Sequence, residues 1–111
     1  MLKTAIALLA MTGSAHALDY WNTGNRLHQQ CSGSGRALVG AYAIAVEDTD
    51  TQGGHVKRDY CTPDGIVMGQ VIDVVCTYLQ NTPEKRHYVG PILVREALTK
   101  AWPCPWKKYQ H

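Results

Sequence analysis

Apolar residues recur at helical spacing in four stretches of the chain, residues 20–31, 36–47, 62–80 and 82–101. In the stretch 62–80 they lie three and four positions apart and cover one broad face, while polar and small residues fall on the opposite face. The apolar set is Val67, Met68, Val71, Ile72, Val74, Val75, Tyr78 and Leu79, and the opposite set is Gly69, Gln70, Asp73, Thr77 and Gln80. This pattern predicts an all-α fold, a small four-helix domain.

Two of these stretches are also compatible with buried strands. Residues 36–47 are almost entirely apolar, and residues 62–80 are rich in β-branched side chains. Four alanines in 36–47 favour a helix, and a helix that is apolar on all sides is expected at the centre of a core. Periodicity alone does not separate a short buried helix from a buried strand, so the strand remains the alternative.

Two helix starts share one signal, Thr62-Pro63-Asp64 and Thr82-Pro83-Glu84. Each combines a capping residue, a proline suited to the first helical position and an acid near the positive end of the helix. The turn at Asn81-Thr82 is very short, so the two helices are expected to run antiparallel as a long helical hairpin over residues 62–101. Gly90-Pro91 should kink or interrupt the second helix.

The chain has four cysteines, for which three pairings are possible. Because Cys61 precedes the first helix of the hairpin and Cys104 follows the second, the hairpin brings these two together. Cys31 is then left for Cys76, so we expect the disulfides Cys61–Cys104 and Cys31–Cys76. No Cys-x-x-Cys occurs, and no histidine has ligand spacing to a cysteine, so we expect no metal and no cofactor. No familiar signature of a catalytic cysteine surrounds any of the four.

The first residues have the three parts of a secretory signal peptide. Lys3 supplies a positive charge, residues 5–11 are apolar, and Ala15-His16-Ala17 has the small-x-small form of a cleavage site. We therefore expect residues 1–17 to be cleaved and residues 18–111 to form a single exported domain. A membrane anchor or an ordinary first helix is the alternative, but the apolar run is much shorter than the roughly 20 residues that span a bilayer.

Size and charge exclude several classes of function. The chain has 111 residues, which is enough for one domain. Its 11 basic and 9 acidic side chains give a net charge of +2, without the clustered basic face that nucleic-acid binding needs. An enzyme, for example a small cell-wall hydrolase, would need a paired acid and base. Glu47, Asp48 and Asp50 cluster, but their spacing matches no pattern that we identify, so we expect no enzyme.

The motifs along the chain resemble the Rap/Tai family of immunity proteins, which protect bacteria from amidase toxins delivered by type VI secretion. The similarity rests on Trp21-Asn-Thr-Gly24-Asn25 with Cys31, on Cys61-Thr-Pro, on Tyr78-Leu79 followed by Pro83-Glu84-Lys-Arg86-His87, and on Ala97-Leu98 with Trp102-Pro103-Cys104. The chain differs from the family in two ways. Residues 37–42 lack a cysteine that the family often has, whereas Cys76 is additional, and Pro91 replaces a plain helical residue.

The resemblance implies a periplasmic immunity protein that binds and blocks a peptidoglycan-cleaving amidase effector, and it implies a homodimer. The alternative is an exported or phage-derived envelope binding module of the same fold with a non-amidase protein partner, because fold does not fix function.

An inhibitor needs a surface that blocks a cleft, and residues 50–60 of the polar loop 48–60 are the best candidate for that surface. We expect its partner-binding residues to be His55, Lys57, Arg58, Asp59 and Tyr60. Arginine and tyrosine are common anchors of protein interfaces. The alternatives are that the loop is a solvated connector or that the polar helix face at Gln70, Asp73 and Thr77 binds the partner. Arg86-His87 could also contact a partner, or could brace the turn instead.

Overall fold

The computed structural model describes residues 22–52 and 58–105. These residues form four α-helices, α1 (Gly24–Gln30), α2 (Arg36–Gln52), α3 (Met68–Asn81) and α4 (Gly90–Ala101), and two 3-10 turns, η2 (Gly33–Gly35) and η3 (Pro83–Lys85). Within the described residues there is no β-strand, only isolated bridges that join Thr23 to Val89 and Tyr60 to Pro103. The predicted all-α class is therefore confirmed, and both stretches with a strand alternative are helical.

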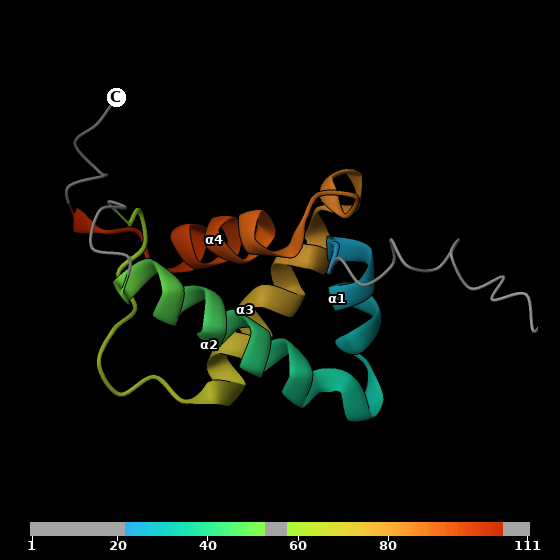
Figure 1. Cartoon of the computed structure of the whole chain (residues 1–111), viewed down its shortest axis with the longest axis horizontal. Coiled ribbons are helices and arrows are strands. Elements are labelled where there is room, and N and C mark those ends of the chain that lie inside the picture. Colours follow the sequence, from blue (N-terminus) through green and yellow to red (C-terminus); the bar gives the residue numbers. More distant parts are fainter. Residues whose placement is uncertain (1–21, 53–57, 106–111) are drawn as a thin grey trace, which may run out of the picture.

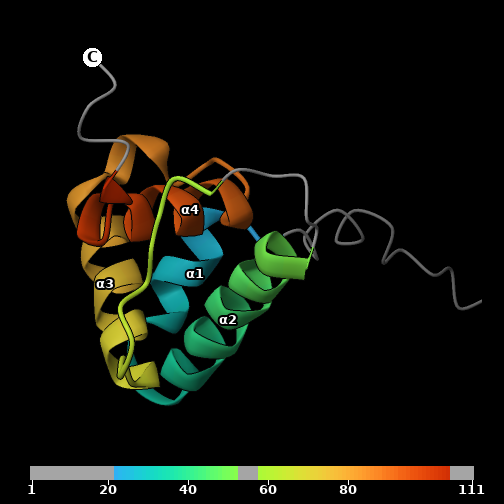
Figure 2. The same ribbon diagram turned by 90° about the vertical axis from the view of Figure 1, so that its left-hand side faces the viewer.

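The four helices pack around one shared core. In Figure 2, α2 and α3 begin close together and diverge, α1 lies between them, and α4 crosses their far ends. Each helix contributes completely buried side chains, among them Leu27, Val39, Val75, Leu79, Leu93 and Leu98. The close start of α2 and α3 depends on Gly40, where a Cβ atom would lie 2.8 Å from the Met68 side chain. Within the described residues, no helix is long and apolar enough to cross a membrane.

Helix α2 is longer than the predicted stretch 36–47 and continues to Gln52. The hydroxyls of Thr49 and Thr51 donate hydrogen bonds to the carbonyls of Ala45 and Glu47, four residues earlier. Asp50 is four positions after Val46 and is buried with it on the same face. Residues 48–52 are thus helical, which corrects the prediction that the loop begins at residue 48.

Helix α3 begins at Met68, six residues later than predicted. The Cys61 N–H donates to the Trp102 carbonyl and the Cys104 N–H to the Asp59 carbonyl, so the backbone before Thr62 is extended. Gly65, at a φ of 83°, then turns the chain, and the Val67 N–H donates to the Gln70 side chain at the helix start. The signal Thr62-Pro63-Asp64 therefore does not start the helix, because pairing with residues 102–104 determines the local conformation.

The connection between α3 and α4 is also longer than predicted. Pro83–Lys85 forms a 3-10 turn, and residues 86–90 then run beside the start of α1. The N–H of Gly24 donates to the Tyr88 carbonyl and the N–H of Gly90 to the Asn22 carbonyl. The expected interruption at Gly90-Pro91 is confirmed, because α4 starts there with the proline in its first turn. As a result α4 crosses α3 rather than lying along its whole length (Figure 1).

Both predicted disulfides are present. Cys31 pairs with Cys76 and joins the end of α1 to α3, with a Cα–Cα distance of 5.8 Å. Cys61 pairs with Cys104 and joins the segment before α3 to the segment after α4, with a Cα–Cα distance of 4.8 Å. The pairing predicted from the hairpin is correct although the helices are shorter, because the bridge between Tyr60 and Pro103 brings the same two segments together.

Candidate partner-binding site

The residues predicted to bind a partner divide into three groups. His55 and Lys57 lie outside the described residues. Arg58 and Asp59 lie at the described end of the loop. Tyr60 is only 1% exposed and belongs to the core, so its prediction as a surface contact is wrong. The reason is a polar partner inside the fold, Asp50, that satisfies the Tyr60 hydroxyl.

Asp50 is the centre of a buried polar network. Tyr60 donates a hydrogen bond of 2.6 Å to Asp50 Oδ2, and Arg95 approaches both carboxylate oxygens, with its Nη2 2.8 Å from Oδ1 and its Nε 3.0 Å from Oδ2. The Arg95 guanidinium holds the pKa of Asp50 below its usual value, although burial opposes this shift. Burial, followed by the bond to Asp50, raises the pKa of Tyr60 far above its usual range, so the phenol stays protonated. The network fixes the end of the loop to α2 and α4.

Arg58 lies on the surface above this network. Its Nη1 donates to Thr51 Oγ1 at 3.0 Å, and its guanidinium carbon lies 5.8 Å from the centre of the Tyr60 ring. These two contacts orient the guanidinium without enclosing it. Asp59 follows directly and lines an open depression of about 580 Å³, together with side chains of α4 that include Arg95 and Lys100. The described end of the loop is therefore held against the α4 surface.

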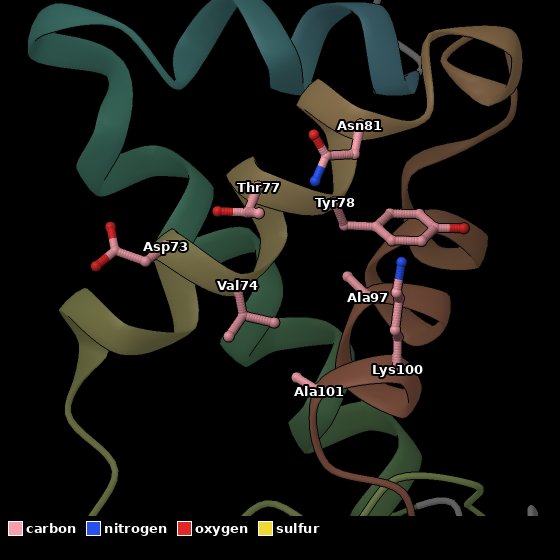
Figure 3. Close-up of a pocket in the computed structure, with 8 residues that line it drawn as sticks. All are labelled: Asp73, Val74, Thr77, Tyr78, Asn81, Ala97, Lys100 and Ala101. Carbon is pink, nitrogen blue, oxygen red and sulfur yellow. The ribbon is translucent and has the colours of Figure 1, made fainter.

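A second depression lies between α3 and α4 and has a volume of about 420 Å³. Figure 3 shows its lining: Asp73 is at one side, Tyr78 and Lys100 are at the other, and the short side chains of Val74, Ala97 and Ala101 lie between them. Thr77 and Asn81 complete it. Tyr78 and Lys100 line both depressions, so the two form one continuous surface that reaches Asp59.

The charges on this surface differ in whether they are already paired. Asp73 accepts a hydrogen bond of 2.6 Å from Arg36 Nη2. Glu96 accepts a hydrogen bond from the Tyr78 hydroxyl and lies 3.4 Å from Lys85 Nζ. Burial, followed by the bond to Glu96, raises the pKa of Tyr78, so this hydroxyl remains a donor. Lys100 is exposed and, within the described part of the chain, forms no ion pair.

The sequence indicated only part of this surface. Asp73 and Thr77 were expected on an exposed face of α3, and they do line the depression. Ala97, Lys100 and Ala101 were not identified as site residues, although their spacing of three and four positions places them on one face of α4. That face could have been recognised only by knowing that α4 crosses α3.

The outer face of α2 is exposed and apolar, contrary to the prediction of a completely buried helix. Leu38 is 58% exposed, and Ala41 and Ala45 are exposed further along the same face. Tyr42 lies beside them and covers Gly90, where a Cβ atom would lie 2.8 Å from the Tyr42 ring. Next to Gly90, Val89 and Ile92 are 40% and 45% exposed. We call the set Leu38, Ala41, Ala45, Val89 and Ile92 the apolar face.

Arg86 braces the turn. Its Nε donates to the Leu79 carbonyl at 2.7 Å and its Nη2 to the Gln80 carbonyl at 3.1 Å, at the C-terminal end of α3. These carbonyls lack helical partners, and a cation near them is also favoured by the helix dipole. Of the two roles considered for Arg86, the structure thus shows the bracing one. His87 packs its ring edge-to-face on Tyr88.

The described residues contain no group of three or more histidine, cysteine, aspartate or glutamate side chains that could hold a metal ion. All four cysteines are in disulfides, so none is available as a thiolate ligand or nucleophile in this state. The described site is a shaped surface with a few oriented charges, which suits binding of a protein.

Of three comparisons with known proteins, the comparison with protein families gives a match. No curated protein and no solved structure matches the chain. Residues 23–104 match the family of Rap1a immunity proteins, a range that starts just before α1 and ends at Cys104. This range contains all four helices and both disulfides. The chain therefore belongs to the Rap1a immunity protein family, and its role is that of an immunity protein that binds an effector protein.

Proposed function

We propose that this protein is a periplasmic immunity protein that binds and blocks a peptidoglycan-cleaving amidase effector of a type VI secretion system. Membership of the Rap1a immunity proteins is the observation that carries the proposal. The two disulfides support export, because such bonds persist in oxidising compartments and are rare in the cytosol. The signal-like pattern of Lys3, residues 5–11 and Ala15-His16-Ala17 supports the same location.

Blocking an amidase requires only that a rigid surface cover the cleft of the enzyme. The surface proposed here consists of His55, Lys57, Arg58 and Asp59 on the loop, together with the adjoining depression lined by Tyr78 and Lys100. The disulfide Cys61–Cys104 and the Asp50 network hold the described end of this loop in place. Such support reduces the entropy lost when a partner binds, which increases affinity without additional contacts.

We also propose that two copies associate through the apolar face. Its residues on α2 are spaced three and four positions apart, so they form one stripe along the helix. Ala41 and Ala45 are small, which allows a second helix to approach closely. Large contiguous exposed apolar patches mark protein interfaces, which supports a role of this stripe in association. This face includes α2 and the start of α4, whereas the proposed effector surface involves the loop, α3 and the later part of α4.

The direct test is inhibition of a peptidoglycan amidase encoded beside this gene. Purified amidase would be mixed with increasing amounts of the immunity protein, and release of cell-wall peptides would be measured. We expect complete inhibition near a one-to-one ratio of binding sites. An amidase that remains fully active at a large excess of the protein would contradict the proposed target. Capture of a non-amidase envelope protein would then favour the alternative of a different protein partner.

A further inference from the structure

The two disulfides are interleaved along the chain. The first cysteine pairs with the third and the second with the fourth, at sequence separations of 45 and 43 residues. The two native loops therefore overlap, and neither native bond joins cysteines that are neighbours in the sequence. Oxidation that occurs before the chain has folded can therefore form non-native disulfides between cysteines that are neighbours in the sequence.

In the unfolded chain, the bond that closes most readily is a wrong one. The sequence separation of Cys61 and Cys76 is only a third of the 45 positions that separate Cys31 from Cys76. Because the probability of closing a flexible loop falls as the three-halves power of its length, the shorter loop is favoured about fivefold. The bond Cys61–Cys76 takes one sulfur from each native pair, so it prevents both native bonds, and the remaining Cys31 and Cys104 can then only join each other. During export, Cys104 also emerges after the other three.

We propose that this protein is a substrate of a thiol–disulfide isomerase, an enzyme that rearranges disulfides through a reactive cysteine thiolate. The thiolate attacks Cys76 Sγ in the bond Cys61–Cys76, which forms a mixed disulfide and releases the Cys61 thiolate. Cys61 then attacks Cys104 Sγ in the bond Cys31–Cys104, which forms Cys61–Cys104 and releases the Cys31 thiolate. Finally Cys31 attacks Cys76 Sγ, forms Cys31–Cys76 and frees the enzyme thiolate. The number of disulfides is the same before and after, so no net oxidant is needed.

The folded structure suits this order of events. Cys104 is completely buried, and its N–H is bonded to the Asp59 carbonyl, so the bond Cys61–Cys104 belongs inside the fold. In the bond Cys31–Cys76, Cys76 is 9% exposed and belongs to the core, whereas Cys31 is half-buried, and both line an open depression of about 560 Å³ together with His28, Arg36 and Thr77. An enzyme joined to Cys76 keeps this sulfur out of the core, so attack by Cys31 from the depression both releases the enzyme and allows Cys76 to pack. Cys31–Cys76 is therefore the bond at which the last exchange takes place.

This inference rests on the export part of the proposed function and is independent of the amidase target, so its test needs no effector. The full chain would be reduced, unfolded in denaturant and diluted into a buffer of reduced and oxidised glutathione. One sample would contain a reduced thioredoxin-fold disulfide isomerase, and the control would contain the same enzyme with its active-site cysteines alkylated. Samples would be quenched with acid over time, and their disulfide-linked peptides identified by mass spectrometry.

We expect Cys61–Cys76 to appear first in both samples and to disappear at least tenfold faster with the active isomerase. A matched variant, Cys31→Ser with Cys76→Ser, keeps only the Cys61–Cys104 pair and so has no wrong bond to rearrange. Formation of its bond should not respond to the isomerase. The inference is overturned if the unmodified chain reaches both native bonds equally fast with active and alkylated enzyme, or if the variant is accelerated as strongly as the unmodified chain.

Discussion

Arg95 in the middle of α4 is bonded to both carboxylate oxygens of Asp50 near the end of α2. The two residues are 45 positions apart in the sequence, and Asp50 is the one buried charged residue in the described part of the chain. Tyr60 adds a further hydrogen bond from the segment that follows the loop. A buried carboxylate is costly unless its oxygens are satisfied, so these three residues are expected to act as a unit.

We first predict that Arg95→Ala lowers the free energy of unfolding by about 2–3 kcal/mol, because it leaves the Asp50 charge buried with one remaining partner. The value lies below the roughly 3–5 kcal/mol typical for breaking a buried pair, since the Arg95 side chain is 42% exposed and partly screened by water. Tyr60→Phe should cost about 1.5–3 kcal/mol by removing a hydrogen bond to a charge. Urea unfolding checks both values, and Lys100→Ala, an exposed cation on the same helix, should change stability by less than about 0.5 kcal/mol. Equal effects of Arg95→Ala and Lys100→Ala would show that the network adds little.

The second prediction concerns acid. The pKa of Asp50 is lowered in the folded state, mainly by the hydrogen bonds from Arg95, below its usual value of 3.8. Because the folded pKa is below the unfolded one, the network stabilises the protein above pH 3.8, and this contribution is lost as the pH falls through the lower folded value. The difference in unfolding free energy between the unmodified chain and Asp50→Asn should therefore be constant near neutral pH and shrink below pH 3.8. A difference that stays the same down to the folded pKa would contradict the assignment, and Asp64→Asn serves as an exposed control.

The third prediction is that protein produced by export contains no free thiol and depends on both disulfides. Each bond should contribute about 2–4 kcal/mol to stability, largely by restricting the unfolded chain. The measurement combines thiol labelling of unreduced protein with urea unfolding before and after reduction. Labelling of two or more cysteines in unreduced, folded protein would rule out the pairing described here.

The fourth prediction locates the effector surface. Replacing His55, Lys57, Arg58 and Asp59 together by alanine should abolish inhibition, because each central contact of an interface can contribute 2 kcal/mol or more, or roughly thirtyfold in affinity. The loop end lies outside the core, so the melting temperature should change little. A control variant, Gln29→Ala with Asp64→Ala, removes exposed side chains elsewhere and should bind normally. Unchanged affinity with an unchanged melting temperature would exclude the loop and leave only the depression at Asp73, Thr77 and Lys100 as the interface.

The fifth prediction concerns the proposed dimer. Leu38→Glu with Ala41→Glu places two charges on the apolar face and should convert a dimer to a monomer in sedimentation experiments, since charges at the centre of an apolar contact lose their hydration. Helix content should be unchanged, because both positions are exposed in the single chain. The control is Asp48→Ala with Thr49→Ala, a pair of exposed polar residues near the other end of α2. A monomer at all concentrations in the unmodified protein would exclude the dimer.

Several helices and both disulfides of this protein could be predicted from local patterns in the sequence. The apolar spacing of 62–80 predicted a helix, and α3 occupies most of it, because a residue and its neighbours three and four positions away share a face in any helix. Gly90-Pro91 was expected to kink or interrupt the stretch 82–101, since proline lacks the N–H that a helix interior requires, and α4 begins at this point. Cysteine positions relative to the two helices were sufficient to predict both disulfides.

Only the tertiary structure decided which surfaces are covered. Tyr60 is a core residue because Asp50 and Arg95, distant in sequence, provide a polar site for its hydroxyl. The sequence Thr62-Pro63-Asp64 does not start a helix, because the Cys61 N–H donates a hydrogen bond to the Trp102 carbonyl and Cys61 forms a disulfide with Cys104. These contacts join segments about forty residues apart. The apolar face of α2 is left exposed because three neighbouring helices cover only one side of it. Hydrophobicity shows that a side chain favours burial, but the packing of the whole chain decides whether a partner element reaches it.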